Sequence, residues 1–173
     1  MYIRKAVPAD APAIEAIYVE ARTFMRAHGN QTQWTGGYPS VMIEEDLALG
    51  QQYICEDEKG GRPLAVFVFF IGEEPNYAHI EDGDWQDDKR PYGVLHRLAV
   101  SECARGQGAA AFCLNWAFSR SGNLRVDTHE DNIPMRNLIE KCGLKRTGTI
   151  YVEDGTPRIA YQRCGRTETE QER

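Results

Sequence analysis

Residues 96–110 read HRLAVSECARGQGAA, and this stretch decides how the rest of the chain is interpreted. It predicts a strand that ends at Val100, a short turn that contains Gly106 and Gly108, and then the start of a helix. The first backbone N–H groups of a helix have no partner within the helix, and the helix dipole places partial positive charge there. Glycines let those amides approach an anion closely, and Arg105 adds a charged donor. The stretch therefore predicts either an anion site of the kind that binds phosphate groups, or only a tight turn that begins a buried helix.

The segments around this stretch alternate between strand-like and helix-like patterns. Strands are predicted over residues 2–6, 52–56, 64–71, 92–100, 124–127, 144–152 and 158–162, and helices over 10–25, 39–49, 105–120 and 132–142. The run AVFVFF, residues 65–70, is apolar on both faces and is expected to be a central strand. This order predicts one α/β (α+β) layered domain over residues 1–165, followed by a polar tail over residues 166–173.

The composition restricts the classes of function. The 173 residues include 42% hydrophobic and 27% charged residues, which suits one globular domain. A net charge of −6 argues against a nucleic-acid partner. Five scattered cysteines without a CxxC pair, and histidines without a ligand pattern, argue against a disulfide scaffold and a metal site. The N-terminus lacks the apolar stretch of a leader peptide, and the longest apolar run is too short to cross a bilayer. A cytoplasmic protein without a membrane partner is therefore expected.

Two blocks of the sequence resemble the GNAT superfamily of acetyl-CoA-dependent N-acetyltransferases. The signature of that family is Arg or Gln, two residues, Gly, one residue, and then Gly or Ala, and Arg105, Gly108 and Ala110 stand at those positions. Glu102 stands where many members have a proline after the preceding strand. The second block is THEDNIPMRNLIEKCGL, residues 128–144, which places an Asn after a strand and a Gly at the end of the next helix. The resemblance covers most of the chain, including its first strand and helix.

The resemblance implies a GNAT-like mixed, mostly antiparallel central sheet flanked by helices, with acetyl-CoA between two splayed central strands. The amine would attack the thioester directly, and a backbone amide of the 92–100 strand would stabilise the oxyanion. The residues implied in cofactor binding are Leu98, Ala99 and Val100 for the pantetheine arm, then Arg105, Gly106, Gln107, Gly108, Ala109 and Ala110 for the pyrophosphate, and Asn132. Family members are often homodimers, so a homodimer is an expectation by analogy.

His96 is the leading candidate for the base that takes a proton from the attacking amine. An alkyl ammonium ion has a pKa of about 10.4, so a base or a water relay must first remove a proton. A histidine ordinarily titrates near neutral pH, which suits this task. The HRLAV text also resembles the arylalkylamine N-acetyltransferases, in which a histidine at this strand position helps to remove the proton. The alternative is a buried histidine that is satisfied by a backbone carbonyl.

The acid that protonates the departing thiolate is unassigned. Many members of the family carry a tyrosine seven residues after the motif Asn, and this sequence has Ile139 there. Tyr151 or Tyr161 from the last strands can substitute, although tyrosines in strands more often pack in the sheet. The thiolate can also leave unprotonated, because a thiol with a pKa of about 8.5 is a fair leaving group.

The acceptor amine is expected near aromatic and polar side chains. Trp34 and Tyr38 lie between the first two helices, where the family shapes acceptor specificity, or else they cover the core. Glu130 can face the acceptor. Alternatively, the His129-Glu130-Asp131 run caps the helix that follows, with Asp131 as the cap.

The sequence supports two hypotheses of different class. The first is an N-acetyltransferase that uses acetyl-CoA to acetylate a primary amine of a small molecule or a peptide. The second is a non-catalytic acyl-CoA-binding regulatory module, which Ile139 favours and His96 opposes. The acidic residues between positions 73 and 88 form either a rim that attracts a cationic amine or a solvated loop.

Overall fold

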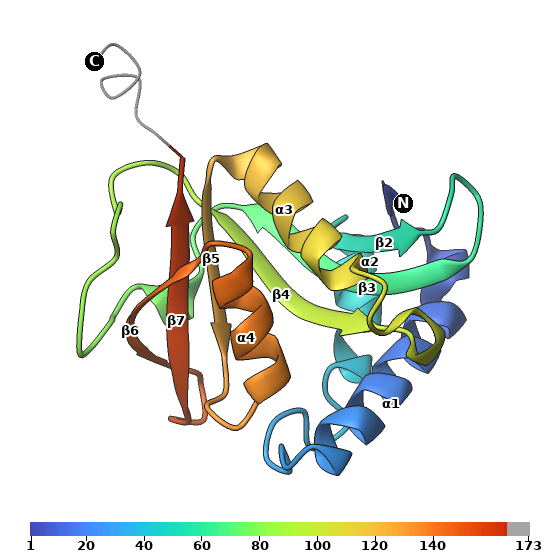
Figure 1. The fold of residues 1–173 in the computed structure, drawn as a ribbon, viewed down its shortest axis with the longest axis horizontal. Helices are drawn as coiled ribbons and strands as arrows, with labels where there is room; N and C mark the ends of the chain where they lie inside the picture. Colours follow the sequence, from blue (N-terminus) through green and yellow to red (C-terminus); the bar gives the residue numbers. More distant parts are fainter. Residues whose placement is uncertain (166–173) are drawn as a thin grey trace.

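A seven-stranded sheet forms the centre of the protein (Figure 1). The computed structural model describes residues 1–165, so the tail predicted over 166–173 lies outside the described residues. In the order in which they pair, the strands are β1 (Tyr2–Lys5), β2 (Gln52–Glu56), β3 (Pro63–Ile71), β4 (Gly93–Val100), β5 (Asn123–Thr128), β7 (Pro157–Cys164) and β6 (Lys145–Tyr151). β4 and β5 are parallel, and every other neighbouring pair is antiparallel. The sheet is mixed and mostly antiparallel, which confirms the predicted fold class.

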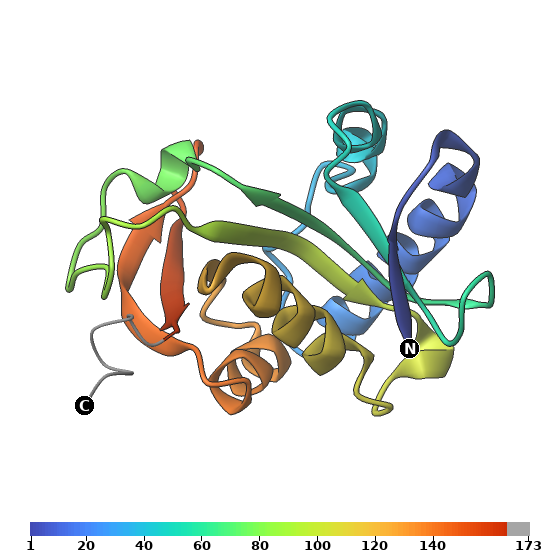
Figure 2. The ribbon, with the colours of Figure 1, turned by 90° about the horizontal axis from the view of Figure 1, so that it is seen from above.

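The helices cover both faces of the sheet (Figure 2). They are α1 (Ala11–Ala27), α2 (Ile43–Ala48), α3 (Ala109–Ser121) and α4 (Ile133–Lys141), and 3-10 turns cover Pro8–Asp10, Ser40–Met42, Pro75–Tyr77 and Glu102–Ala104. α1 and α2 pack on one face through an apolar stripe that includes Ile14 and Tyr18, and α3 and α4 pack on the other. Val66 of β3 belongs to the first cluster and Phe67 to the second, so β3 is apolar on both faces because both are covered. No helix within residues 1–165 has the length and apolar character that crossing a membrane requires.

β4 and β5 separate after their first residues, which opens the sheet. Residues 93–94 of β4 pair with residues 124–125 of β5, and no further register pair joins these two strands within the described chain. β4 also carries a bulge against β3, and Arg97 within it has a φ of 54°. A bulge bends its strand and redirects the side chains around it. The second half of β4 is therefore bordered by β3 on one side and by an open gap on the other.

Two of the predicted helices begin later than the sequence pattern indicates. The helix predicted over 105–120 starts at Ala109, because Gly106 and Gly108 take left-handed conformations with φ values of 77° and 83°. The helix predicted over 39–49 starts at Ile43, after a 3-10 turn. The first difference matters for function, since residues 105–108 form a turn in place of the first helical turn.

The loop between β3 and β4 is anchored by one buried arginine. Arg125 of β5 is 1% exposed, and its guanidinium carbon lies 4.1 Å from the ring centroid of Trp85 and 3.8 Å from that of Tyr92. Its Nη2 donates to the backbone carbonyl of Asp87 at 2.9 Å and to Asp88 Oδ1 at 2.6 Å. Cation–π contacts are stronger when they are desolvated. Arg125 therefore holds this loop against the sheet.

Arg125→Leu is expected to lower the free energy of unfolding by about 2–3 kcal/mol, because it removes two cation–π contacts and two charged hydrogen bonds. Chemical denaturation of the variant and the parent protein measures the difference. Arg26→Leu, at an exposed position of α1, is the control and should change stability by less than about 0.5 kcal/mol. Equal effects of the two substitutions would show that other contacts hold the loop.

Candidate active site

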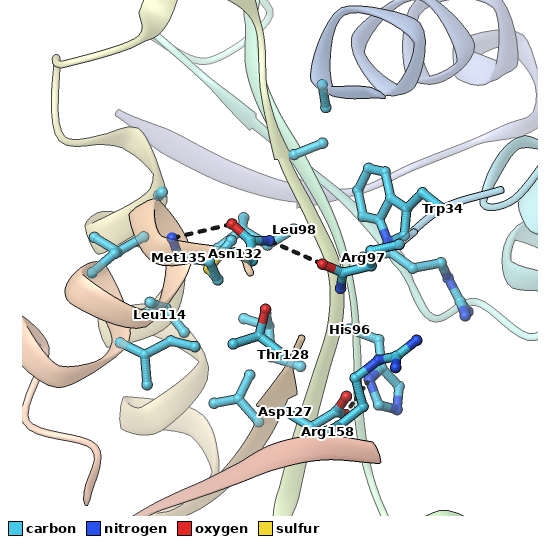
Figure 3. Close-up of a pocket in the computed structure, with 18 of the residues that line it drawn as sticks. Trp34, His96, Arg97, Leu98, Leu114, Asp127, Thr128, Asn132, Met135 and Arg158 are labelled. Atoms are coloured by element: carbon cyan, nitrogen blue, oxygen red, sulfur yellow. Dashed lines mark hydrogen bonds and ion pairs between the residues drawn. The ribbon is translucent and has the colours of Figure 1, made fainter. Parts of the chain in front are cut away.

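A cleft of about 1530 Å³ follows the gap between β4 and β5. Residues 95–100 of β4 form one wall, and residues 126–128 of β5 form the facing wall. The turn before α3, the first turn of α4, the α1–α2 loop, the start of the β3–β4 loop and the β6–β7 hairpin also line it. The cleft thus collects segments that are far apart in the sequence, and Figure 3 shows part of it.

The turn before α3 has the geometry of an anion site. Gly106 and Gly108 line the cleft, and a Cβ atom added at either position would meet no atom within 4 Å. Gly108 is the N-cap of α3, so the amides that follow it have no partner within the helix. Ala109 and Ala110 also line the cleft and keep the first turn slim. Open space in front of unpartnered amides at a helix N-terminus suits a phosphate group.

The two longer side chains of this turn are held by the protein itself. Arg105 lines the cleft, but its guanidinium lies 4.5 Å from the ring centroid of Phe24, and its Nη2 donates to the carbonyl of Glu20 at 3.0 Å. Gln107 is exposed, donates to the carbonyl of Cys103 at 2.6 Å and does not line the cleft. Arg105 therefore ties the turn to α1, and a contact with phosphate would require its side chain to leave Phe24.

Leu98, Ala99 and Val100 belong to the β4 wall of the cleft. The register pairs of β4 with β5 end at residue 94, so this edge of the strand continues without a strand partner in the described chain. Such an edge presents backbone N–H and C=O groups to whatever lies beside it. The three residues are therefore placed where an extended ligand can add to the sheet.

Asn132, and not Asp131, caps α4. The Asn132 Oδ1 accepts a 3.3 Å hydrogen bond from the amide of Met135, and its Nδ2 donates to Gln33 Oε1 at 3.1 Å (Figure 3). The capping prediction for Asp131 is wrong, because the following residue takes the N-cap position. Glu130 is exposed and does not line the cleft. Asn132 therefore connects α4 to the α1–α2 loop across the cleft.

His96 lies between two carboxylates at the β4 wall. Its Nε2 is 2.9 Å from Glu74 Oε2, and its Nδ1 is 3.7 Å from Asp127 Oδ1. The same oxygen of Asp127 accepts a 2.7 Å hydrogen bond from the hydroxyl of the buried Tyr77. The four side chains form a chain of polar contacts in the order Tyr77, Asp127, His96 and Glu74.

The protonation states of these side chains follow from their contacts. Burial alone would raise the pKa of Glu74, but the hydrogen bond and charge of His96 and the donors of Asn76 together hold it below its usual value. Glu74 is therefore ionised at neutral pH and can only accept, so Nε2 of His96 carries the proton and Nδ1 is the basic nitrogen. Burial and the charge of Asp127 raise the pKa of Tyr77 well above its usual value, so Tyr77 stays a neutral donor. Each ring nitrogen of His96 thus faces a carboxylate oxygen.

Three of these four side chains are not singled out by the sequence. Glu74 stands 22 residues before His96, and Tyr77 stands 50 residues before Asp127. The acidic character of the segment from 73 to 88 is the one signal that points to Glu74. Asp127 meets His96 because β5 lies beside β4, and Tyr77 meets Asp127 because the β3–β4 loop folds back over β5.

Trp34 and Tyr38 stand on the α1–α2 side of the cleft. Trp34 packs edge-on against Tyr18 and Tyr38, with ring centroids 5.7 and 6.3 Å apart. The Tyr38 hydroxyl accepts a 3.0 Å hydrogen bond from Nη1 of Arg97, whose Nη2 lies 2.5 Å from Oδ1 of the buried Asp46. Burial raises the pKa of Tyr38, although Arg97 opposes this. The two aromatic residues therefore both line the cleft and cover the core.

None of the three positions considered for the general acid places a hydroxyl in the cleft. Ile139 lines the cleft but is fully buried and apolar. Tyr151 is exposed and donates to Glu81 Oε2 at 3.0 Å. Tyr161 is buried and donates to Glu140 Oε1 at 3.4 Å. Neither tyrosine lines the cleft.

Acidic side chains outnumber basic ones in the cleft. The acidic ones are Glu45, Asp46, Glu73, Glu74, Asp127, Glu153 and Asp154, and the basic ones are Arg97, Arg105, Lys141 and Arg158. Arg105 and Lys141 belong to the side of α3 and α4, and Arg97 is paired with Asp46. The negative charge therefore prevails in the part that is bordered by the α1–α2 loop, the β3–β4 loop and the β6–β7 hairpin, which favours a cation there.

Known proteins resemble this chain in sequence and architecture. The sequence model of the acetyltransferase (GNAT) family matches residues 13–144. An uncharacterised N-acetyltransferase of Bacillus subtilis strain 168, YesJ, is 27% identical over 156 residues, which cover 85% of this chain and 83% of that protein. A streptothricin acetyltransferase of Escherichia coli is 26% identical over 118 residues, which cover 65% of each chain. The crystal structure of a GNAT-family acetyltransferase from Streptococcus agalactiae matches with a TM-score of 0.86 and 29% identity over 96% of both chains.

Proposed function

Because the chain belongs to the acetyltransferase (GNAT) family, we propose that it transfers an acetyl group from acetyl-CoA to a primary amine of a small molecule or a peptide. The amine attacks the thioester carbonyl directly, so no acyl-enzyme forms. The observation that carries this proposal is His96, held at the wall of the cleft between Glu74 and Asp127. A histidine at the wall of the cleft, held in place by two carboxylates, supports a role in proton removal.

The side of the cleft near α3 and α4 fits acetyl-CoA. The amides at the start of α3, with open space at Gly106 and Gly108, suit the pyrophosphate. The unpaired edge at residues 98–100 suits the amide groups of the pantetheine arm, and one of its N–H groups suits the oxyanion. Asn132 lies beside this edge, and its Nδ2 becomes a donor for the ligand once Gln33 releases it. The ligand supplies the activated acetyl group, and these residues bind and orient it.

His96 takes at Nδ1 the proton that makes the acceptor an ammonium ion, releases it to solvent, and then takes the second proton that the nitrogen loses as the amide forms. The amine nitrogen attacks the carbonyl carbon, the C–S bond breaks, and CoA leaves with the electron pair on sulfur. Glu74 and Asp127 stabilise the imidazolium that results, and Tyr77 fixes the orientation of Asp127. A positioned base of this kind accelerates proton transfer by about 10²–10⁴-fold.

The acceptor is proposed to be a cationic amine. The excess of carboxylates at the acceptor end of the cleft supports this class, because it raises the local concentration of cations. The opposite sign prevails at the α3 side, where an anionic cofactor would lie. The two ends of the cleft thus differ in charge as the two substrates would.

Glu45→Gln is expected to raise KM for a cationic acceptor about 2–5-fold with little change in kcat, because it removes one attractive charge from the cleft. Initial rates at low and moderate salt measure the effect, which should shrink as salt rises. The adjacent Glu44→Gln removes the same charge from an exposed residue that does not line the cleft. Equal KM changes in both variants would point to a general field effect and not to a cleft contact.

The proposed activity is tested by following free thiol release from acetyl-CoA across a panel of polyamines, amino acids, aminoglycosides, arylalkylamines and lysine peptides. Amine-dependent release, with the acetylated amine identified by mass spectrometry, is the expected result. Tight acetyl-CoA binding with no release for any acceptor would instead support the non-catalytic acyl-CoA-binding module, which the apolar Ile139 favours. A cytoplasmic location and a homodimer stay predictions.

A further inference from the structure

Thr128 carries a hydroxyl that lacks a partner beside the cleft. The residue is the last of β5, lines the cleft and is 1% exposed. Its Oγ1 is buried and forms no hydrogen bond with any residue of the described chain. Buried polar groups in proteins are nearly always hydrogen-bonded. Because Thr128 also lines the cleft, its hydroxyl is a candidate hydrogen-bond donor to a ligand bound there.

The direction of this side chain follows from the strand. Side chains alternate between the two faces of a sheet, and Leu124 and Val126 belong to the apolar cluster under α3 and α4. Thr128 therefore points toward the α3 and α4 face. Asp127 points to the opposite face, where it meets His96. His96 and the Thr128 hydroxyl thus approach the cleft from opposite faces of the sheet.

The surroundings of Thr128 place it on the cofactor side. Figure 3 shows Thr128 and Leu114 on one side of β4, with Trp34 and Arg97 on the other. The hydroxyl of Tyr38 lies with Arg97 on that other side. Ile139, which also lines the cleft, presents only carbon atoms. Thr128 is therefore the buried hydroxyl that faces the side where CoA would lie.

We propose that Thr128 donates a hydrogen bond from Oγ1 to the sulfur of CoA as the thioester breaks, an inference that rests on the proposed function. When the amine nitrogen bonds to the carbonyl carbon, the electron pair of the C–S bond moves to sulfur and the proton of the amine moves to His96. Thr128 stays neutral, because an alcohol is far less acidic than a thiol. The thiolate accepts the hydrogen bond and later takes a proton from solvent, while His96 releases its own. Because the amine would lie on one face of the sheet and the departing sulfur on the other, the base and the hydrogen-bond donor must also lie on opposite faces.

The first test needs no acceptor. Bound CoA is titrated through the ultraviolet absorbance of its thiolate, in the wild type and in Thr128→Val, which replaces the hydroxyl by a methyl group of similar size. The thiol bound to the wild type is expected to titrate about one pH unit lower than the thiol bound to Thr128→Val, a tenfold difference in acidity. Thr128→Ser keeps the donor and should titrate like the wild type. A role in packing alone would leave the titration unchanged.

Thr147→Val is the matched control. Thr147 is 8% exposed, and its Oγ1 also lacks a partner in the described chain, but it lies on β6 and does not line the cleft. This variant should leave the titration of bound CoA unchanged. Thr128→Ala replaces Thr128→Val if the latter does not fold.

The second test uses an accepted amine and two acetyl donors. Thr128→Val is expected to lower kcat with acetyl-CoA about 10–100-fold, and to lose much less with an aryl thioester, whose more acidic thiol needs no donor. Identical titration of CoA bound to wild type and Thr128→Val, or identical losses with both donors, would overturn the role of Thr128. If CoA titrates lower on the wild type than on Thr128→Val but the wild type acetylates no amine, the proposed function would be refuted. The Thr128–sulfur contact would then still stand.

Discussion

His96→Gln is expected to lower kcat/KM by about 100-fold near neutral pH. Glutamine can keep a hydrogen bond to Glu74 but cannot take a proton from the amine. The variant then depends on amine that is already neutral, roughly one molecule in 2,500 at pH 7 for a pKa of about 10.4. Because that fraction rises tenfold per pH unit, the deficit should shrink as the pH approaches the pKa of the amine. The measurement is the pH profile of kcat/KM from mildly acidic to alkaline pH.

His79→Gln is the matched control for this substitution. His79 also pairs with a carboxylate, Glu81 at 3.1 Å, but it is exposed and does not line the cleft. Its loss should leave the profile unchanged, and acetyl-CoA affinity should stay the same in both variants. A His96→Gln profile with the same shape and height as the parent would remove His96 as the base.

Gly108→Trp is expected to weaken acetyl-CoA binding by at least about 100-fold in calorimetry. The indole would fill the open space in front of the α3 amides, where the pyrophosphate is proposed to lie. A side chain at the φ of 83° also costs about 1–2 kcal/mol of stability. Affinity and unfolding must therefore be measured on the same samples.

Gly60→Trp separates the two effects. Gly60 has a φ of 75° and open space around its Cβ position, but it lies in the β2–β3 hairpin and does not line the cleft. This variant should carry a similar cost in stability and bind acetyl-CoA as the parent protein does. Unaltered affinity in Gly108→Trp would defeat the assignment of the pyrophosphate site.

The parts of the protein that depend on short stretches of sequence could be predicted. The turn before α3 follows from two glycines and a helix start, and the structure gives Gly106 and Gly108 the left-handed conformations and open surroundings that such a turn requires. The order of strands and helices follows from apolar periodicity, which each segment carries within itself. The start of α3 was harder to predict, because the same glycines that form the turn also delay the helix to Ala109.

The parts that depend on tertiary contacts could not be predicted. Glu74 and Tyr77 reach His96 through the folding of the β3–β4 loop, which the buried Arg125 fixes, and Asp127 reaches it because β5 lies beside β4. The orphan hydroxyl of Thr128 is visible only once its surroundings are known. The charge of Arg105 and the family signature predict a phosphate contact, whereas its stacking on Phe24 of α1 depends on a residue that is distant in the sequence.

The separation of β4 and β5 has a mechanical consequence. One short segment of two register pairs joins the β1–β4 half of the sheet to the β5–β7–β6 half, so the hydrogen-bonded ladder of the sheet is interrupted between β4 and β5. A ligand that hydrogen-bonds along the free edge of β4 and touches β5 bridges this interruption as a strand would. Since a ligand that binds only the folded state adds its binding free energy to stability, loading with acetyl-CoA should make the two halves unfold as one unit and slow amide exchange along β4 most.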